Sequence, residues 1–440
     1  MEKPAKKPDT LCLAPWVHTY LSPQTERRMC CASREPAQSF EQYIDTSSGT
    51  GTYNPVSLAD HWNSDHMRDV RRRMMAGETL PECDVCNSKL LNTDVYRDYF
   101  WHLFKHKYDD IWEHTNEEGY TAMNTVSWDY RFSNLCNFAC MQCGDMLSSQ
   151  WESEERSNNM INWDNPQNSW MEPSIRKQIA AFQKGQVNQE FEEAIKHHNV
   201  EEIYWVGGEP LMMEEHWRYM KWIIDNGDGG KLYARYNTNL SRRNYKGVDL
   251  FKDILPQIRD WQICASFDGT GEIGEYIRYG LNEDRFITFF KAGQEVMAYP
   301  RQMRLDFTLT LPGLFELDNM FKLSQELGTQ VLSKVTFAFT PDIMMSPLAL
   351  PKHILHRIVN KFLDTHKEYD ENQRPLIDVM TNLLQRPTFE EQWPNEYEAG
   401  RIKGKKRIEK IESIRLMSCH FEDILRTEDT EAYEWWKSIT

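Results

Sequence analysis

The sequence predicts an α/β protein with a mainly parallel sheet, a cysteine-rich segment before it and a helical extension after it. Between Met123 and Pro341, short runs rich in β-branched and aromatic residues alternate with longer stretches of helical periodicity. The segment before this region holds five of the ten cysteines, and the segment after it shows only helical patterns. We therefore expect three domains, over residues 1–115, 116–345 and 346–440.

The composition limits the classes of protein to which the chain can belong. A hydrophobic content of 40% over 440 residues provides sizeable cores, and the net charge of −16 disfavours a large nucleic-acid surface. The first residues lack the apolar stretch of a signal peptide, and no run approaches the ~18 apolar residues of a membrane span. Clustered cysteines in such a chain indicate metal ligands rather than disulfides. We expect a cytoplasmic protein that does not enter a membrane.

The first segment carries its cysteines in the pattern of a metal-binding knuckle. They are Cys12, Cys30, Cys31, Cys83 and Cys86. A CxxC pair joined to distant cysteines closes around a tetrahedral metal ion or an iron–sulfur cluster, and the chemistry alone favours zinc and iron–sulfur equally. The same segment predicts a helix over residues 65–76 and an aromatic-rich helix over residues 94–112.

Six strands are predicted in the central region. They cover residues 125–132, 203–206, 231–236, 261–267, 305–311 and 334–339. The helical stretches between them, such as residues 285–298 with a stripe of Phe and Met, indicate a parallel sheet. In a sheet of this kind the functional residues gather at the carboxyl ends of the strands.

Three cysteines follow the first of these strands at spacings of four and three residues. Cys136, Cys140 and Cys143 offer soft thiolate ligands, which suit iron–sulfur clusters, zinc and copper(I). Three ligands leave one corner of a [4Fe–4S] cluster open, and an open position marks a metal site that does chemistry. The alternative is a set of buried structural thiols.

Polar and glycine-containing turns follow the next three strands. Gly207, Gly208 and Glu209 follow the second, Asn237 and Thr238 the third, and Ser266, Asp268 and Arg278 the fourth. Paired glycines permit positive φ and a close approach of the backbone to a ligand. A guanidinium is the natural bidentate partner of a carboxylate.

The CxxxCxxC spacing resembles the cluster loop of the radical S-adenosylmethionine (SAM) superfamily. The resemblance implies a partial (βα)6 barrel, a [4Fe–4S] cluster on Cys136, Cys140 and Cys143, and SAM bound to the fourth iron. It also implies reductive cleavage of SAM to a 5′-deoxyadenosyl radical that abstracts a substrate hydrogen. The residue before the third cysteine is usually aromatic in this family, and here it is Gln142.

The later turns extend the resemblance to the SPASM/twitch subgroup. Gly207, Gly208 and Glu209 resemble the GGE motif that binds the SAM amino group, and Asn237-Thr238-Asn239 resembles the TN turn. Ser266 and Arg278 have the spacing of residues that contact the SAM ribose and carboxylate, while Asp268 either binds ribose or turns the chain.

The cysteines of the first segment resemble those of a twitch domain, which carries an auxiliary [4Fe–4S] cluster. This domain usually follows the radical SAM core, and here it precedes it. The resemblance favours iron–sulfur over zinc. The family usually has Gly five residues before the second ligand, and Thr25 occupies that position, which indicates Cys30 and leaves Cys31 open.

Two further segments lie outside this pattern. A polar insertion over residues 145–199 contains Trp151, Trp163 and Trp170 and is either a lid, a packed helical decoration or a disordered surface segment. Beyond Pro341, helices are predicted over residues 352–364 and 376–384. The basic run 401–406 is a solvated face or, less often, a binding surface.

Together these resemblances imply a radical SAM enzyme with a peptide or protein substrate, and a small molecule is the other option. An electron donor such as flavodoxin or ferredoxin is then needed. Two alternatives remain: a radical SAM enzyme that modifies nucleotides or RNA, and a noncatalytic protein that binds an iron–sulfur cluster or zinc. The sequence does not identify a catalytic acid or base.

Overall fold

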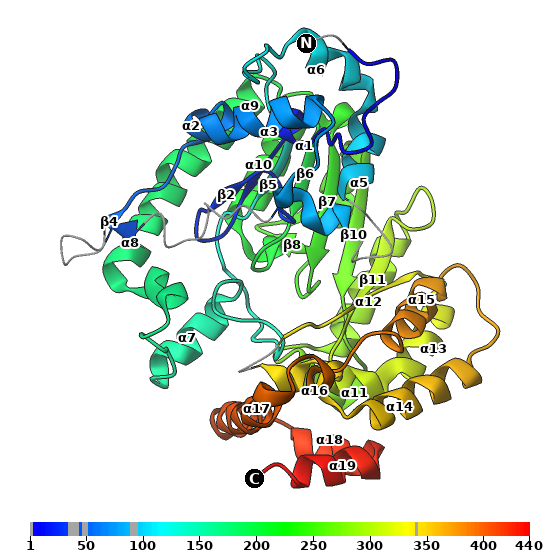
Figure 1. Cartoon of the computed structure of the whole chain (residues 1–440). Coiled ribbons are helices and arrows are strands. Elements are labelled where there is room, and N and C mark those ends of the chain that lie inside the picture. Colours follow the sequence, from blue (N-terminus) through cyan, green and yellow to red (C-terminus); the bar gives the residue numbers. More distant parts are fainter. Residues whose placement is uncertain (1–2, 34–43, 46–51, 89–95, 339–341) are drawn as a thin grey trace. The chain divides into compact units, whose positions relative to one another are not determined.

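The computed structural model describes residues 3–33, 44–45, 52–88, 96–338 and 342–440. An eight-stranded sheet has the order β12-β11-β10-β7-β6-β5-β1-β2 (Figure 1). Its strands are β1 His18–Leu21, β2 Arg27–Arg28, β5 Ser127–Tyr130, β6 Glu202–Trp205, β7 Tyr233–Thr238, β10 Asp260–Ser266, β11 Met303–Leu309 and β12 Val331–Val335. β5 pairs in parallel with β1 and β6, and β11 pairs in parallel with β10 and β12. The predicted α/β class with a mainly parallel sheet is confirmed.

The six predicted strands appear in the predicted order with shifted ends, and two further strands, β1 and β2, join the sheet. Residue 339, the last of the predicted strands' residues, lies outside the described part of the chain. β12 begins at Val331, three residues earlier than expected, because Gly328 ends the preceding helix in a left-handed conformation and Val331 is fully buried. β1 was not predicted. Its four residues are all buried, so the alternation that reveals a half-exposed strand is missing. β2 pairs with β1 in the antiparallel direction at one edge.

The chain forms two compact units. The first comprises Met1–Asn134, Met160–Arg235 and Lys252–Trp261. Helix α3, Asp65–Met75, agrees with the predicted helix and starts at Ser64, whose side chain accepts a hydrogen bond from the Met67 N–H. The helix predicted over residues 94–112 is two helices, α5 Tyr96–Phe104 and α6 Tyr108–Glu113, separated by a 3₁₀ turn; residues 94 and 95 lie outside the described part.

An aromatic core covers one face of β5 in this unit. Trp128 and Phe132 contact Phe191 with ring centroids 5.2 and 5.7 Å apart, and Phe191 contacts Tyr219 at 5.1 Å. Phe191 lies on α9, Asn188–Lys196, and Tyr219 on α10, Glu214–Asp225. Because side chains alternate along a strand, Ser127, Asp129 and Arg131 point to the opposite face. This face of β5 is therefore polar.

The second unit comprises Leu135–Asn159, Tyr236–Phe251 and Gln262–Thr440. Its carboxyl-terminal part is helical, as predicted, with α14 Lys352–Thr365, α15 Arg374–Leu383, α17 Pro394–Ile414, α18 Phe421–Glu428 and α19 Thr430–Lys437 (Figure 1, yellow to red). The basic run 401–406 lies on α17. Arg401 pairs with Glu398 beside it, and Lys405 donates a hydrogen bond to the Ile439 carbonyl at 2.8 Å, so these two cations are used within the chain.

The insertion over residues 145–199 is a packed helical decoration. It contains α7 Ser149–Ser157, α8 Pro173–Phe182, a π-helical turn Gln183–Val187 and α9. Trp151 and Trp170 are buried, whereas Trp163 is 51% exposed. No helix in the described part of the chain is both long enough and apolar enough to span a membrane.

A buried ion pair joins β2 to α9 in the first unit. The Arg27 side chain is fully buried and pairs with Glu190, and its Nη1 donates to the Tyr130 hydroxyl at 2.7 Å. The Glu190 carboxylate also accepts from the Leu58 N–H at 2.7 Å. Because both side chains are more than nine-tenths buried, each charge depends on the other.

Replacing Arg27 by Met should destabilise the first unit, because Glu190 would be left buried without its cation. A loss of about 3–5 kcal/mol is expected, which lowers the melting temperature by on the order of 10 °C. Circular dichroism melting measures this. The double variant Arg27→Met, Glu190→Gln should recover part of the loss, and Lys196→Met, which removes only the exposed pair with Glu193, should leave the melting temperature unchanged. Equal melting of the Arg27 and Lys196 variants would contradict the argument.

Candidate functional site

The three cysteines at spacings of four and three lie on an irregular loop in the second unit. Cys140 is buried, and Cys136 and Cys143 are partly buried. The Cys143 N–H donates to the Cys140 carbonyl within the loop at 3.0 Å, and other buried backbone groups of the loop need partners from other segments. Two segments supply them.

The first segment is the end of α11, Gly271–Ile277, and the residues after it. The N–H of Ala139 donates to the Tyr279 carbonyl at 3.0 Å, and the N–H of Met141 donates to the Ile277 carbonyl at 2.7 Å. Gly280 has φ of +110°, and a Cβ there would lie 2.9 Å from the Phe138 ring. Only glycine permits this conformation and this close approach.

The second segment is the start of α7, within the insertion. The Ser148 hydroxyl donates to the Phe138 carbonyl at 2.5 Å and also caps the helix. The Trp151 indole N–H donates to the Cys140 carbonyl at 2.7 Å, and the Cys136 N–H donates to the Ser149 hydroxyl at 3.1 Å. The insertion therefore holds the cysteine loop.

Two side chains direct N–H groups at the sulfurs. Arg278 Nη1 lies 3.7 Å from Cys140 Sγ, and Asn239 Nδ2 lies 3.9 Å from Cys136 Sγ. Asn239 also donates to the Asn137 side chain at 3.1 Å. Donors to sulfur stabilise thiolates and tune the reduction potentials of iron–sulfur clusters.

Asp268 organises the residues around Arg278. Its carboxylate is fully buried, pairs with Arg278 Nε at 2.7 Å and accepts a hydrogen bond from the Gln142 amide. The Thr308 N–H donates to its other oxygen at 2.7 Å. Burial raises the pKa of Asp268, and the Arg278 charge opposes that shift. The carboxylate thus fixes both Arg278 and Gln142.

The other predicted residues of this unit lie at the ends of β7 and β10. The Asn237 amide donates to Asp306 Oδ2 at 2.8 Å, and Lys334 pairs with the same oxygen at 2.9 Å. Ser266 is the residue of β10 opposite Asp306 in the parallel pairing with β11. The Thr238 hydroxyl accepts from the Leu240 N–H at 2.9 Å. Asp306 thus brings Asn237 and Lys334 together.

The paired glycines lie after β6 in the first unit. Gly207 and Gly208 have φ of +81° and +49°. A Cβ on Gly207 would lie 2.7 Å from the Arg131 side chain, so glycine is required there for space as well as conformation. Glu209 is buried, and its carboxylate accepts from the Leu211 N–H at 3.0 Å.

The cysteines of the first segment separate into two neighbourhoods. Cys12 and Cys30 are buried in the same hydrophobic core, and Cys83 packs against it. Burial raises the pKa of the Cys12 thiol to about 12, with added repulsion from Cys83 and Cys86. Burial also raises the pKa of Cys30, with repulsion from Cys31, Cys12 and Cys83. Cys83 thus acts on both Cys12 and Cys30, which lie far from it in the sequence, and Cys31 acts on its neighbour Cys30.

Cys31 faces a different environment. Burial raises its pKa to about 11, with repulsion from Asp129 opposed by attraction from Arg131. Thr25, at the position that the twitch resemblance assigns to Gly, has φ of +68°, a conformation that favours glycine. The backbone at this position therefore has the shape that a glycine would adopt.

No three Cys, His, Asp or Glu side chains are grouped so as to hold a metal ion in the ranges that the structure describes. The metal assigned to either cysteine set stays a prediction. Two residues of the site were given no site role from the sequence: Trp151, and Arg415, whose Nη1 lies 3.2 Å from Met141 Sδ on the loop. Asn239 had a sequence signal, because it belongs to the Asn237-Thr238-Asn239 turn.

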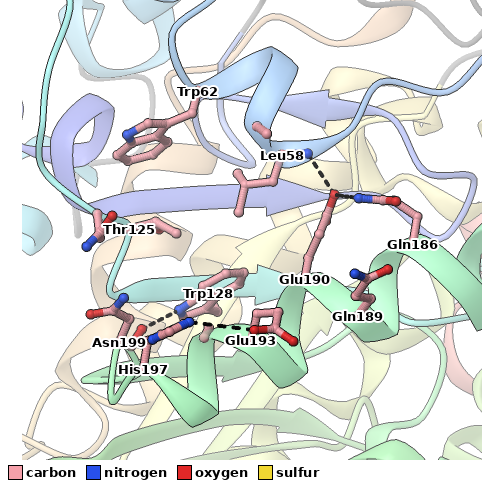
Figure 2. Close-up of a pocket in the computed structure, with 13 residues that line it drawn as sticks. Leu58, Trp62, Thr125, Trp128, Gln186, Gln189, Glu190, Glu193, His197 and Asn199 are labelled. Carbon is pink, nitrogen blue, oxygen red and sulfur yellow. Dashed lines mark hydrogen bonds and ion pairs between the residues drawn. The ribbon is translucent and has the colours of Figure 1, made fainter.

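A cavity of about 370 Å³ lies elsewhere in the first unit (Figure 2). Trp62 and Leu58 form one side, α9 and the π-helical turn the other, and Trp128 lies between them. Its carboxylates already have partners: Glu190 accepts from the Leu58 N–H, and Glu193 lies 3.6 Å from His197. No predicted site residue lines it.

No family model and no curated protein match this chain. Solved structures that resemble it include Streptococcus suis SuiB bound to precursor peptide SuiA, at 11% identity over 85% of this chain and 80% of that one, with a TM-score of 0.32. Native anSMEcpe with bound AdoMet is 14% identical over 59% of this chain and 66% of that one, with a TM-score of 0.34. A second structure, native anSMEcpe with bound AdoMet and Cp18Cys peptide, is 14% identical to this chain. The match covers 46% of the anSMEcpe chain and has a TM-score of 0.29. Similarity this low does not identify the family of this chain.

The packing of α7, the helix that contacts the cysteine loop, can be tested through the pH dependence of the protein's stability. Burial raises the pKa of Glu155 on α7 to about 7, and Asp145 adds to the shift. The folded chain therefore holds an extra proton between the unfolded pKa of 4.5 and about 7, so stability is lost as pH rises through this window.

Glu155→Gln should remove this loss, because the amide does not ionise. The variant should melt a few degrees above the wild type at pH 8, and the difference should vanish towards pH 4.5. Melting curves of both proteins across this range measure the effect. A difference that stays constant with pH would rule out Glu155 as its source.

Proposed function

We propose that this chain is a radical SAM enzyme whose catalytic [4Fe–4S] cluster is held by Cys136, Cys140 and Cys143. The observation that carries the proposal is the three-thiol loop, whose backbone is held from two sides while N–H donors from Asn239 and Arg278 approach two of its sulfurs. A structural thiol set needs no such donors. The donor set fits an anionic cluster, because Arg278 supplies a buried positive charge beside Cys140.

When bound, the cluster and SAM would supply the 5′-deoxyadenosyl radical that abstracts a substrate hydrogen. The chain's own residues would bind and orient SAM. The backbone of Gly207 and Gly208, with its positive φ angles, would bind the SAM amino group, and the Glu209 carboxylate accepts a hydrogen bond from the Leu211 N–H in the turn that follows. Arg278, held by Asp268, would pair with the SAM carboxylate, and Asn237, Thr238 and Ser266 complete the proposed SAM contacts.

The proposed substrate is a peptide or protein, and the proposed setting is the reducing cytoplasm with a flavodoxin or ferredoxin as electron donor. This part rests on the resemblance of the motifs to the SPASM/twitch subgroup, in which many members modify peptides. A small-molecule substrate would use the same cluster and SAM residues.

Anaerobically reconstituted protein, reduced and given SAM, should form 5′-deoxyadenosine. Replacing Cys136, Cys140 and Cys143 together by Ala should reduce formation to the background without enzyme, because the cluster loses its ligands. The matched control is Cys419→Ala, which removes a buried thiol whose Sγ contacts the Glu272 carbonyl, and which should keep full formation. If wild-type protein with verified clusters forms no product above background, the enzyme proposal is wrong.

We also propose an auxiliary [4Fe–4S] cluster on Cys12, Cys30, Cys83 and Cys86, in a twitch-like first domain. The shared core of Cys12 and Cys30, with Cys83 packed against it, supports Cys30 rather than Cys31 as the second ligand. The left-handed backbone at Thr25 also agrees with this assignment. An auxiliary cluster there would take an electron from the product radical or bind substrate.

In the triple Ala variant of Cys136, Cys140 and Cys143, the first segment should still bind about four irons per chain. Adding Cys30→Ala should abolish this iron, whereas adding Cys31→Ala should leave it, because Cys31 faces Asp129 and Arg131 instead. Iron and zinc analysis after reconstitution with both metals measures the difference. A content of one zinc and no iron per chain would contradict the auxiliary cluster and indicate a structural zinc site instead.

A further inference from the structure

Arg415 is a buried cation that the proposed function leaves unused. It follows α17 in the carboxyl-terminal extension, and its side chain is 1% exposed. Its Nε and Nη2 lie 3.0 and 2.8 Å from one carboxylate oxygen of Glu154 on α7. A charge so deeply buried persists only when it is paired, and it acts on its surroundings with little screening by solvent.

The rest of the guanidinium faces the cysteine loop. Nη1 lies 3.2 Å from Met141 Sδ, between the second and third cysteines. The guanidinium stacks on Trp151 at 4.3 Å and on Tyr279 at 4.8 Å from the ring centroids. These two residues hold the backbone of the loop at Cys140 and Ala139. Arg415 therefore packs against both Trp151 and Tyr279, the two residues that bind the backbone of the loop.

The pair with Glu154 is oriented, with its positive end toward the loop. The Glu154 carboxylate binds the guanidinium through Nε and Nη2, whereas Nη1 is directed at Met141 Sδ on the loop. If a group on the loop gains negative charge, its attraction to the Arg415 guanidinium is therefore stronger than its repulsion by the Glu154 carboxylate.

We propose that Arg415 is a positioning residue of the cysteine loop whose buried charge favours one-electron reduction of the cluster held there. This inference rests on the proposed function of Cys136, Cys140 and Cys143. With a cluster bound there, a low-potential donor such as reduced flavodoxin would lose one electron and the cluster would gain it, with no bond formed or broken and no proton moved. The buried guanidinium of Arg415 would favour the added negative charge.

The test is the midpoint potential of the reconstituted full-length protein without SAM, followed by electron paramagnetic resonance. The relevant signal is the one that disappears in the triple Ala variant of the loop cysteines. Arg415→Met should disfavour reduction at least tenfold, a fall of about 59 mV. Glu154→Gln should shift the potential upward, because it removes the opposing charge and leaves the cation. Arg415→Lys should stay near the wild type.

An electrostatic effect shifts the midpoint potentials of Arg415→Met and Glu154→Gln in opposite directions. Structural damage would shift both potentials in the same direction. The double variant Arg415→Met, Glu154→Gln should still fall below the wild type, since the positive end of the pair faces the loop. A double variant with the wild-type potential would mean that the single change acts only through an unpaired Glu154, and this would overturn the proposal.

The matched control is Arg407→Met on α17. Arg407 also lies near the Trp151 ring, at 5.5 Å, but pairs with Asp342 and is 19% exposed, so water screens it. It should change the potential much less than Arg415→Met, and an equal change would overturn the proposal. If Arg415→Met fails to fold, Glu154→Gln still decides by its sign. Absence of any loop-dependent signal in the wild type would instead refute the proposed function.

Discussion

The structure around the cysteine loop depends on one constraint: its buried peptide groups have no regular element to bond with and need partners from outside. Ile277 and Tyr279 provide carbonyl acceptors, and Trp151 and Ser148 provide side-chain donors. These partners come from the turn after α11 and from the insertion. The loop is therefore shaped by segments far away in sequence.

The fold could be predicted from the sequence where burial leaves a periodic signal. The strands of the central region alternate with helices of clear period, and the order of six strands follows from this. β1 could not be found in the same way, because all four of its residues are buried and their types mix His, Thr, Tyr and Leu. The break between α5 and α6 was likewise invisible in a continuous aromatic pattern.

The residues of the candidate site also fall into two groups, those with a signal in the sequence and those without one. Spacing in the sequence brings Cys136, Cys140 and Cys143 onto one loop and places Arg278 at a strand end, where the structure has it close to Cys140. The pairing of Asp268 with Arg278 and Gln142 could not be predicted, because it needs three-dimensional proximity between residues up to 126 positions apart. Arg415 had no sequence signal at all, since a single Arg after a helix is usually a surface residue.

The division of the chain into two compact units has a consequence for how it folds during synthesis. The first unit takes three separate stretches, the last of them Lys252–Trp261, and the second unit begins between them, at Leu135. The first unit therefore cannot be complete until Trp261 has left the ribosome, after parts of its neighbour have already emerged. No single cut in the chain releases both units whole. Fragments that end at a helix boundary would carry unfinished cores, so the chain must be handled as one piece.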